Sequence, residues 1–285
     1  MPSSDPVVMA AGDNVCGADS SGGQCKQMAT SDLLVAAKPA AVLVLGDVQY
    51  ECGEAADFTS FYDPSWGRVK DRTRPSVGNH EYITSTDPAN PCHGNPPEAQ
   101  AYFDYFGAAA GEKGKGYYSF DVGDWHLIAL NSNCTQVGGC FVGSEQEKWL
   151  RADLAAHPTA CTLAYWHAPL YSSGGRDTPD TEKLYQALYE ANADLILTGH
   201  DHTYERFGPQ TSTGVKDAAR GIRQFVVGTG GRNLTGWETI APNSEMRNNT
   251  TFGVLKLTLH PNSYDWQFVP IVGQSFIDTG TTACH

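Results

Sequence analysis

Residues 41–50, AVLVLGDVQY, set the fold class, because five consecutive apolar residues end at a Gly-Asp pair. An uninterrupted apolar run of this length is typical of a strand that is buried on both faces of a sheet. Residues 6–11, PVVMAA, form a similar run that ends at Gly12-Asp13, and apolar residues at helical spacing predict a helix over residues 27–38. Two buried strands joined through a helix predict a parallel βαβ unit, and hence an α/β fold.

The rest of the chain predicts more elements of the same kinds. A capping box at residues 144–147, SEQE, predicts a helix that continues to about residue 155. We expect further strands at 74–77, 161–166 and 193–197, a hairpin from 117–120 and 125–130, a helix at 181–191, and antiparallel strands at 224–227, 254–259 and 264–268. Since there is no internal repeat and no break in composition, we expect one catalytic domain over residues 1–285.

Polar residues follow the predicted strands at the point where each strand ends. Asp13, Asp47, Asn79, His167 and His200 each come at or just after the carboxyl end of an apolar strand. Open α/β sheets bind their ligands at that edge. Carboxylate, amide and imidazole groups delivered there by five strands predict a metal site.

The charge of the chain restricts its partners. The sequence has 19 Lys and Arg against 32 Asp and Glu, which gives a formal net charge of -13. A surface this acidic repels nucleic acid and anionic membranes, so we expect no nucleic-acid-binding surface. No run of about 18 apolar residues occurs, which predicts no membrane span. The sequence carries no indication of the oligomeric state.

Five motifs in a fixed order carry a family resemblance: Gly12-Asp13, LGDVQY at 45–50, GNHE at 78–81, YWHAP at 165–169 and GHDHTYER at 199–206. The series resembles the calcineurin-like metallophosphoesterases and, within them, the purple acid phosphatases and related bacterial secreted phosphatases. The resemblance covers residues 12–206. It implies a four-layer αββα sandwich of two mixed β-sheets flanked by helices, which the strand pattern alone does not distinguish from one open sheet.

The resemblance also implies two metal ions and a ligand set for each. The first ion is assigned to Asp13, Asp47, Tyr50 and His202, and the second to Asp47, Asn79, His167 and His200, so that Asp47 bridges the pair. Mixed nitrogen and oxygen ligands suit iron, zinc or manganese better than calcium.

The first motif departs from the commonest family pattern, Asp-x-His, because Asn14 and Val15 follow Asp13. Purple acid phosphatases also lack that histidine and use a tyrosinate three residues after the bridging aspartate, where Tyr50 stands here. A phenol has an unperturbed pKa near 10, so its ionisation at neutral pH needs a strongly acidic cation. We therefore expect Fe(III) at the Tyr50 site, with Fe(II), zinc or manganese at the second.

The function that the resemblance implies is metal-dependent hydrolysis of small phosphate monoesters by in-line attack of a metal-bound hydroxide. Asp47 and His80 are the expected catalytic residues, with His80 binding the phosphate or protonating the leaving group. Residues 170–177 lack the histidines that plant and animal relatives use to hold substrate, and Arg176 is the expected substitute. Two alternatives stay open: a phosphodiesterase with the same site, or a secreted binding protein without turnover.

Two other features bear on these expectations. The turn at residues 228–231, GTGG, follows a strand but lacks the spacing of a phosphate-binding motif, so we expect it at most to line the metal cleft.

Eight cysteines without a CxxC pair indicate disulfides and therefore a secreted or periplasmic protein. Cys16 with Cys25 and Cys134 with Cys140 could each close one loop. Of the three pairings open to the other four, we favour Cys52–Cys92 and Cys161–Cys284. The first residues, MPSSDPVV, do not resemble a signal peptide, so we expect that Met1 opens the mature chain without it.

Overall fold

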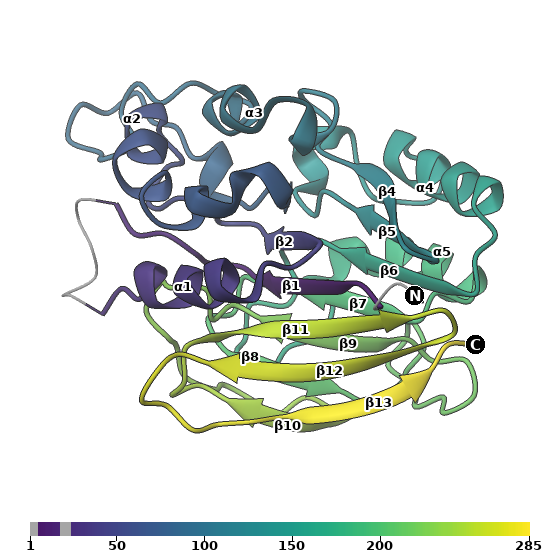
Figure 1. Cartoon of the computed structure of the whole chain (residues 1–285). Coiled ribbons are helices and arrows are strands. Elements are labelled where there is room, and N and C mark those ends of the chain that lie inside the picture. Colours follow the sequence, from purple (N-terminus) through teal and green to yellow (C-terminus); the bar gives the residue numbers. More distant parts are fainter. Residues whose placement is uncertain (1–4, 18–23) are drawn as a thin grey trace.

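The computed structural model describes residues 5–17 and 24–285, and it contains two mixed β-sheets that pack face to face (Figure 1). The six-stranded sheet runs, in order across the sheet, β13 (Thr279–Ala283), β12 (Ser263–Pro270), β11 (Gly253–His260), β1 (Val7–Ala11), β2 (Ala41–Leu45) and β3 (Thr73–Ser76). The seven-stranded sheet runs β10 (Ser244–Asn248), β8 (Tyr204–Phe207), β9 (Arg223–Val227), β7 (Leu195–Thr198), β6 (Cys161–Tyr165), β5 (Trp125–Ala129) and β4 (Tyr118–Val122). Met1 and residues 18–23 of the Gly/Ser-rich loop lie outside the described residues.

Helices flank the two sheets and cover part of their outer faces, while β12 and β13 carry no helix on the side seen in Figure 1. Helix α1 (Gln27–Ala37) lies on the six-stranded sheet, and α2 (Ala55–Asp57) and α3 (Gln100–Phe106) lie beyond the end where β2 and β3 are found. Helices α4 (Glu145–Ala156) and α5 (Glu182–Glu190) pack beside each other. The Ser144 hydroxyl accepts from the Glu147 N–H at 3.3 Å, which confirms the predicted start of α4.

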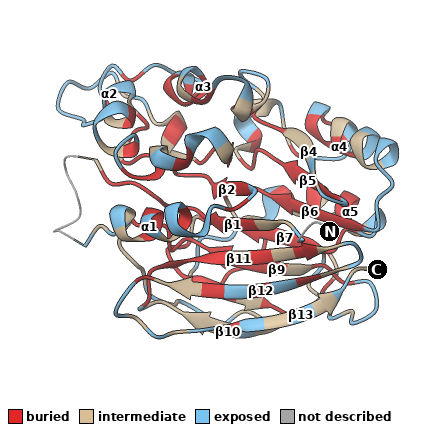
Figure 2. Cartoon of the chain, viewed as in Figure 1, coloured by how far each residue is buried: buried red, intermediate tan, exposed pale blue. Residues whose placement is uncertain are grey.

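Alternating side chains of the seven-stranded sheet belong to two separate apolar cores, and strands such as β5 and β6 are buried along their length (Figure 2). In β5, Leu127 and Ala129 join the core between the two sheets, whereas Ile128 joins the core beneath α4 and α5. In β6, Leu163 likewise joins the core between the sheets, and Ala164 joins the core beneath α4 and α5. Because successive side chains of a strand point to opposite faces, the sheet is buried on both sides. The predicted four-layer sandwich is therefore confirmed.

Parallel strands at the centre of each sheet bring their carboxyl ends to one edge of that sheet. β1, β2 and β3 are parallel to one another, and so are β5, β6, β7 and β9. The two carboxyl edges meet, since the N–H of Gly12 after β1 donates to Val227 O in β9 at 2.9 Å. Strand ends from both sheets thus converge on one place.

The expected antiparallel arrangement of the last three predicted strands is only partly right. β11 and β12 are antiparallel, but β9 lies in the other sheet, parallel to β7 and antiparallel to β8. Strands β8, β10 and β13 were not predicted, because their sequences, YERF, SEMRN and TGTTA, lack an apolar run. Among the described residues, no helix is long and apolar enough to cross a membrane.

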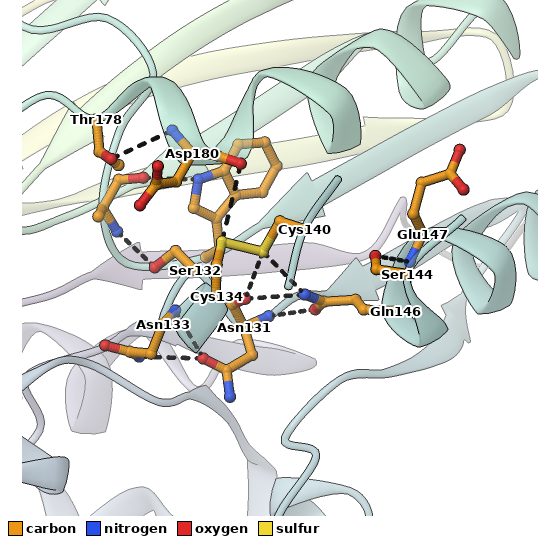
Figure 3. Close-up of a disulfide and its surroundings, with 12 residues drawn as sticks. Asn131, Ser132, Asn133, Cys134, Cys140, Ser144, Gln146, Glu147, Thr178 and Asp180 are labelled. Carbon is orange, nitrogen blue, oxygen red and sulfur yellow. Dashed lines mark hydrogen bonds between the residues drawn. A yellow bond between two sulfur atoms is a disulfide. The ribbon is translucent and has the colours of Figure 1, made fainter. Parts of the chain in front are cut away.

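All eight cysteines are paired as favoured from the sequence: Cys16–Cys25, Cys52–Cys92, Cys134–Cys140 and Cys161–Cys284. The Cys134–Cys140 bond closes the loop after β5, and Figure 3 shows it among side chains of that loop such as Asn131 and Asn133. In this loop the Ser132 hydroxyl accepts from the Ala168 N–H at 2.9 Å, and the Asn133 amide donates to Val77 O at 3.3 Å. The disulfide-closed loop therefore contacts the segments that carry two predicted metal ligands, His167 and Asn79.

The disulfides should differ in how much they stabilise the fold. Cys161–Cys284 spans 123 residues and Cys134–Cys140 spans 6, so chain entropy assigns them about 4–5 and about 2–2.5 kcal/mol respectively. We expect the double variant Cys161→Ala/Cys284→Ala to lose more unfolding free energy in urea than Cys134→Ala/Cys140→Ala. Equal losses would contradict a loop-closure origin of the stabilisation.

Candidate metal centre

The shared carboxyl edge brings the predicted ligands together. Asp13 follows β1, Asp47 follows β2, Asn79 follows β3, His167 follows β6 and His200 follows β7, as the ends of the apolar runs predicted. Tyr50 lies in the turn after Asp47, and His202 lies two residues beyond His200. All seven side chains belong to one group of mutual contacts, which has two halves.

The backbone at this edge is under strain. Asp13, Asp47 and His200 have φ values of 60°, 44° and 71°, in the left-handed region that non-glycine residues seldom occupy. Strain of this kind persists at functional sites, where the surrounding structure imposes it. The loops are also crowded, because a Cβ on Gly78 would lie 2.0 Å from the Asp47 nitrogen. Close packing of loops explains why glycine stands in the GNHE motif.

The first half surrounds the hydroxyl of Tyr50. This oxygen lies 2.7 Å from Asp13 Oδ1, 2.9 Å from Asp47 Oδ2 and 3.0 Å from His202 Nε2. All four side chains are buried. The Nδ1 of His202 donates to the carbonyl of Asn233 at 2.7 Å. The other ring nitrogen of His202, Nε2, therefore faces the cluster as an acceptor. One hydroxyl proton therefore faces three acceptor atoms, an arrangement that a cation would satisfy.

The second half surrounds Nε2 of His167. This atom lies 3.0 Å from Asn79 Oδ1, 3.2 Å from Asp47 Oδ1 and 3.0 Å from His200 Nδ1. The other ring nitrogen of His167 donates to the carbonyl of Leu45 at 2.8 Å, which leaves Nε2 free to bind. Donor atoms of Asp47, His167 and His200 lie within 4.8 Å of one another. Asp47 is the side chain that both halves share, through Oδ2 in the first and Oδ1 in the second.

Electrostatics at the centre favour bound positive charge. Burial alone would raise the pKa of Asp47, but the charges of His167 and His80 outweigh it and hold that pKa well below the usual range. Burial would lower the pKa of His167, yet the Asp47 carboxylate raises it to about 9. Burial and the neighbouring His167 lower the pKa of His200 to about 4. The Asp47 carboxylate is thus stabilised by positive charge, and the His200 imidazole stays neutral. A carboxylate and a neutral imidazole side by side are a donor set that fits metal ions.

The pKa of Tyr50 also depends on whether a cation is bound. Burial and the carboxylates of Asp13 and Asp47 raise the pKa of its phenol well above the ordinary value. Without a cation the phenol therefore keeps its proton and donates it to the carboxylates. A tyrosinate at this position requires a cation strong enough to displace that proton.

Glu81, the last residue of GNHE, has a role that the sequence did not reveal. Its buried carboxylate accepts from the N–H groups of Gly78 and Val48, both at 2.8 Å, and of Gln49 at 3.2 Å. It thereby joins the loop after β2 to the loop after β3. Burial and the nearby Asp47 raise its pKa to about 7. The GNHE motif drew attention to this segment, but the loop amides that Glu81 accepts from come partly from residues 48 and 49 and are seen only in the structure.

The two predicted substrate residues lie at the open side of the centre. The His80 side chain is 22% exposed, and its Nε2 lies 3.8 Å from Asp47 Oδ2. Its backbone N–H also donates to Asp47 Oδ1 at 2.9 Å. Arg176 is exposed, with a guanidinium nitrogen 3.5 Å from the carbonyl of His200. Both side chains therefore contact residues of the centre while remaining accessible to solvent.

The turn at residues 228–231 was expected at most to line the cleft, and it continues into a loop, residues 228–235, that contacts the first half of the centre. Its Arg232, which the sequence did not single out, has its guanidinium carbon 4.8 Å from the centroid of the Tyr50 ring. The same guanidinium forms an ion pair with Glu51. The signal available was the glycine-rich turn itself, which lets the backbone come close to the first strand end.

Two mixed sheets that present carboxylates, histidines, an amide and a tyrosine at one shared edge define the metallophosphoesterase class. The family model of the calcineurin-like phosphoesterases matches residues 22–204, and the chain belongs to this family. The resemblance inferred from the five motifs is thereby confirmed.

Relatives place the chain close to the purple acid phosphatases. Purple acid phosphatase 15 of Arabidopsis thaliana is 28% identical over 211 residues, which are 61% of this chain and 37% of that protein. Purple acid phosphatase 21 of the same plant is 37% identical over 100 residues, 33% of this chain and 22% of that protein. The structure of purple acid phosphatase PPD1 from yellow lupin seeds superimposes with a TM-score of 0.80 at 21% identity, covering 98% of this chain and 54% of that one. The chain thus corresponds to about half or less of the length of these relatives.

Proposed function

We propose that this chain hydrolyses small phosphate monoesters with two metal ions, and that residues 1–285 act as one catalytic domain. The observation that carries the proposal is the position of Asp47, whose two carboxylate oxygens each belong to a different half of the centre. A carboxylate so placed can bridge two cations. The family membership supports the phosphoester as substrate class.

Asp13, Asp47, Tyr50 and His202 would hold the first ion, and Asp47, Asn79, His167 and His200 the second. When bound, the two ions would supply an activated water and positive charge for the oxygens of an in-line displacement. The phenol of Tyr50 favours Fe(III) at the first position, while the Asn79 amide and the two histidines suit Fe(II), zinc or manganese at the second. The four disulfides support a place outside the cytoplasm.

The chain itself supplies binding and proton transfer. His80 can hydrogen-bond the phosphate or donate a proton to the leaving oxygen, since its side chain is partly exposed and its Nε2 lies 3.8 Å from Asp47 Oδ2. Arg176 can pair with the phosphate oxygens, because guanidinium matches them bidentately. With a net charge of -13, the protein needs such local positive charge to admit an anionic substrate.

Two nitrophenyl esters test the substrate class. We expect the metal-loaded protein to hydrolyse the nitrophenyl monoester with a kcat/KM at least about tenfold above that for the bis-nitrophenyl diester, a preference of about 1.4 kcal/mol. The opposite ranking would establish the phosphodiesterase alternative. Failure with both esters across a broad pH range would leave the binding-protein alternative.

Removal of the Tyr50 hydroxyl tests the identity of the first ion. We expect the isolated protein to contain iron and to show a visible charge-transfer band, and Tyr50→Phe to lose that band, because the band requires a phenolate bound to Fe(III). Elemental analysis and the visible spectrum measure both properties. A colourless wild-type protein that holds only zinc or manganese would contradict this assignment. Tyr171→Phe, which removes the hydroxyl of a tyrosine that bonds Ser212 O, serves as the matched control.

A further inference from the structure

The backbone of the loop at residues 228–235 is fixed to the first half of the metal centre. The N–H of Gly230 donates to Gly12 O at 3.0 Å, and the N–H of Arg232 donates to Asp13 O at 2.9 Å. The Asn233 carbonyl accepts from His202 Nδ1 at 2.7 Å. The N–H of Thr235 also donates to His202 O at 3.1 Å, so hydrogen bonds along its length fix this loop to the ligands, although it follows every family motif in the sequence.

The side chain of Arg232 is held on two sides. Its guanidinium lies 4.8 Å from the centroid of the Tyr50 ring and makes an ion pair with the Glu51 carboxylate. The side chain is only 14% exposed, compared with 31% for Glu51. A cation over an aromatic face and a charge-assisted hydrogen bond are each stronger when they are partly shielded from water. Arg232 therefore keeps Glu51 in one orientation.

Glu51 in turn contacts the ring of His80. Its backbone carbonyl lies 2.6 Å from His80 Nδ1, and its carboxylate lies 3.7 Å from the same nitrogen. The Tyr50 ring packs beside His80, with ring centroids 4.4 Å apart. A hydrogen bond from Nδ1–H to the carbonyl fixes the ring so that Nε2 faces the metal centre, 3.8 Å from Asp47 Oδ2.

We propose that Arg232 and Glu51 are positioning residues that hold His80 in the orientation needed to donate a proton to the leaving oxygen. The inference rests on the proposed hydrolysis of phosphoesters. Arg232 acts at a distance, through Glu51 and the Tyr50 ring, and its guanidinium is already paired rather than free for phosphate. Without it, the partly exposed Glu51 carboxylate can turn to solvent, so that Nδ1 of His80 keeps its bond to the Glu51 carbonyl but loses the anion 3.7 Å away that shields it from water.

Kinetics of Arg232→Met test the proposal, since methionine keeps an apolar stem against Tyr50 and removes the ion pair. We expect kcat for an alkyl phosphate to fall about 10-fold, in the range that loss of an orienting partner costs. For a nitrophenyl phosphate, whose leaving group needs little protonation, the fall should be about 2-fold, with KM changed by less than about 2-fold. Metal content should equal that of the wild type. Arg232→Lys, which keeps a positive charge to pair with Glu51 but lacks the planar guanidinium over Tyr50, should recover part of the loss.

Two combined variants show whether Arg232 acts through its proposed partners. Glu51→Gln/Arg232→Met should be no slower than Arg232→Met, because both changes break one chain of contacts. In a His80→Ala background, Arg232→Met should have no further effect on kcat. An additional loss in that background would overturn the proposal, as would a rise in KM that is equal for all esters, which would show that Arg232 binds phosphate directly. Loss of metal in Arg232→Met would show a purely structural role.

A measurement independent of turnover separates this inference from the proposed function. In protein labelled with ¹⁵N-histidine, the His80 Nδ1–H signal, identified by its absence in His80→Ala, should be detectable in the wild type. It should weaken or disappear through exchange with water in Arg232→Met. An unchanged signal would contradict the positioning role even in a fully active enzyme. A wild-type protein that hydrolyses no ester would refute the proposed function. The Nδ1–H signal would still show whether Arg232 holds the ring of His80.

Discussion

Asp47→Asn should abolish hydrolysis and reduce the bound metal from two ions per chain to one or none. The variant keeps the shape of the side chain and removes the negative charge that both halves of the centre share. Loss of one preorganised electrostatic partner costs about 10²–10³ in rate. Since Asp47 would hold two ions at once, we expect a fall in kcat/KM of at least about 10³-fold.

Elemental analysis and monoester turnover of the same preparation measure both effects. Asp124→Asn is the matched control, because this exposed aspartate lies in the turn between β4 and β5, outside the centre. The control should keep both metals and full activity. An Asp47→Asn protein that retained two ions and turned over at the wild-type rate would show that the ions bind without the shared carboxylate.

His80→Ala should have the second largest effect, and it should act on turnover alone. The substitution leaves the backbone N–H that donates to Asp47 Oδ1 and removes only the imidazole at the open side of the centre. We expect kcat to fall by about 10²-fold or more for alkyl phosphates, as for other general acids. Nitrophenyl phosphate, with its better leaving group, should lose less.

Metal content separates this role from that of a ligand. His80→Ala should retain both ions, as should His93→Ala, a histidine-to-alanine control at an exposed position. Loss of an ion in His80→Ala alone would make His80 a metal ligand and refute its assignment as a proton donor. An unchanged kcat for alkyl phosphates would exclude His80 from proton transfer altogether.

Much of the architecture could be predicted because buried parallel strands have a simple sequence pattern. The runs at β1, β2, β6 and β7 end within one or two residues of the predicted positions, and the polar residue after each run reaches the common edge. Strand β8 was not found, since its Tyr204-Glu205-Arg206 segment looks polar. Its polar groups are satisfied by distant partners instead: Glu205 by Ser173, and Arg206 by Asp278. Such partners come from the tertiary fold and leave no local pattern.

The same limit applies to the centre. Side chains that follow strands could be selected from the sequence, but the groups that orient them could not. The acceptors for the Nδ1 atoms of His167 and His202 are backbone carbonyls of Leu45 and Asn233, which any residue could provide. Arg232 reaches Glu51 across 181 positions of sequence. Contacts of this kind depend on how the loops fold over the edge, and only the structure shows them.

Anomalous diffraction from crystals of the metal-loaded protein would show directly whether two ions share the Asp47 carboxylate. We expect two peaks about 3.5–4 Å apart, one on each side of the Asp47 carboxylate. Tyr50 and His202 should contact the first peak, and His167 and His200 the second. A single peak, or two peaks that do not share Asp47 as a ligand, would contradict the two-metal centre proposed for this edge of the fold.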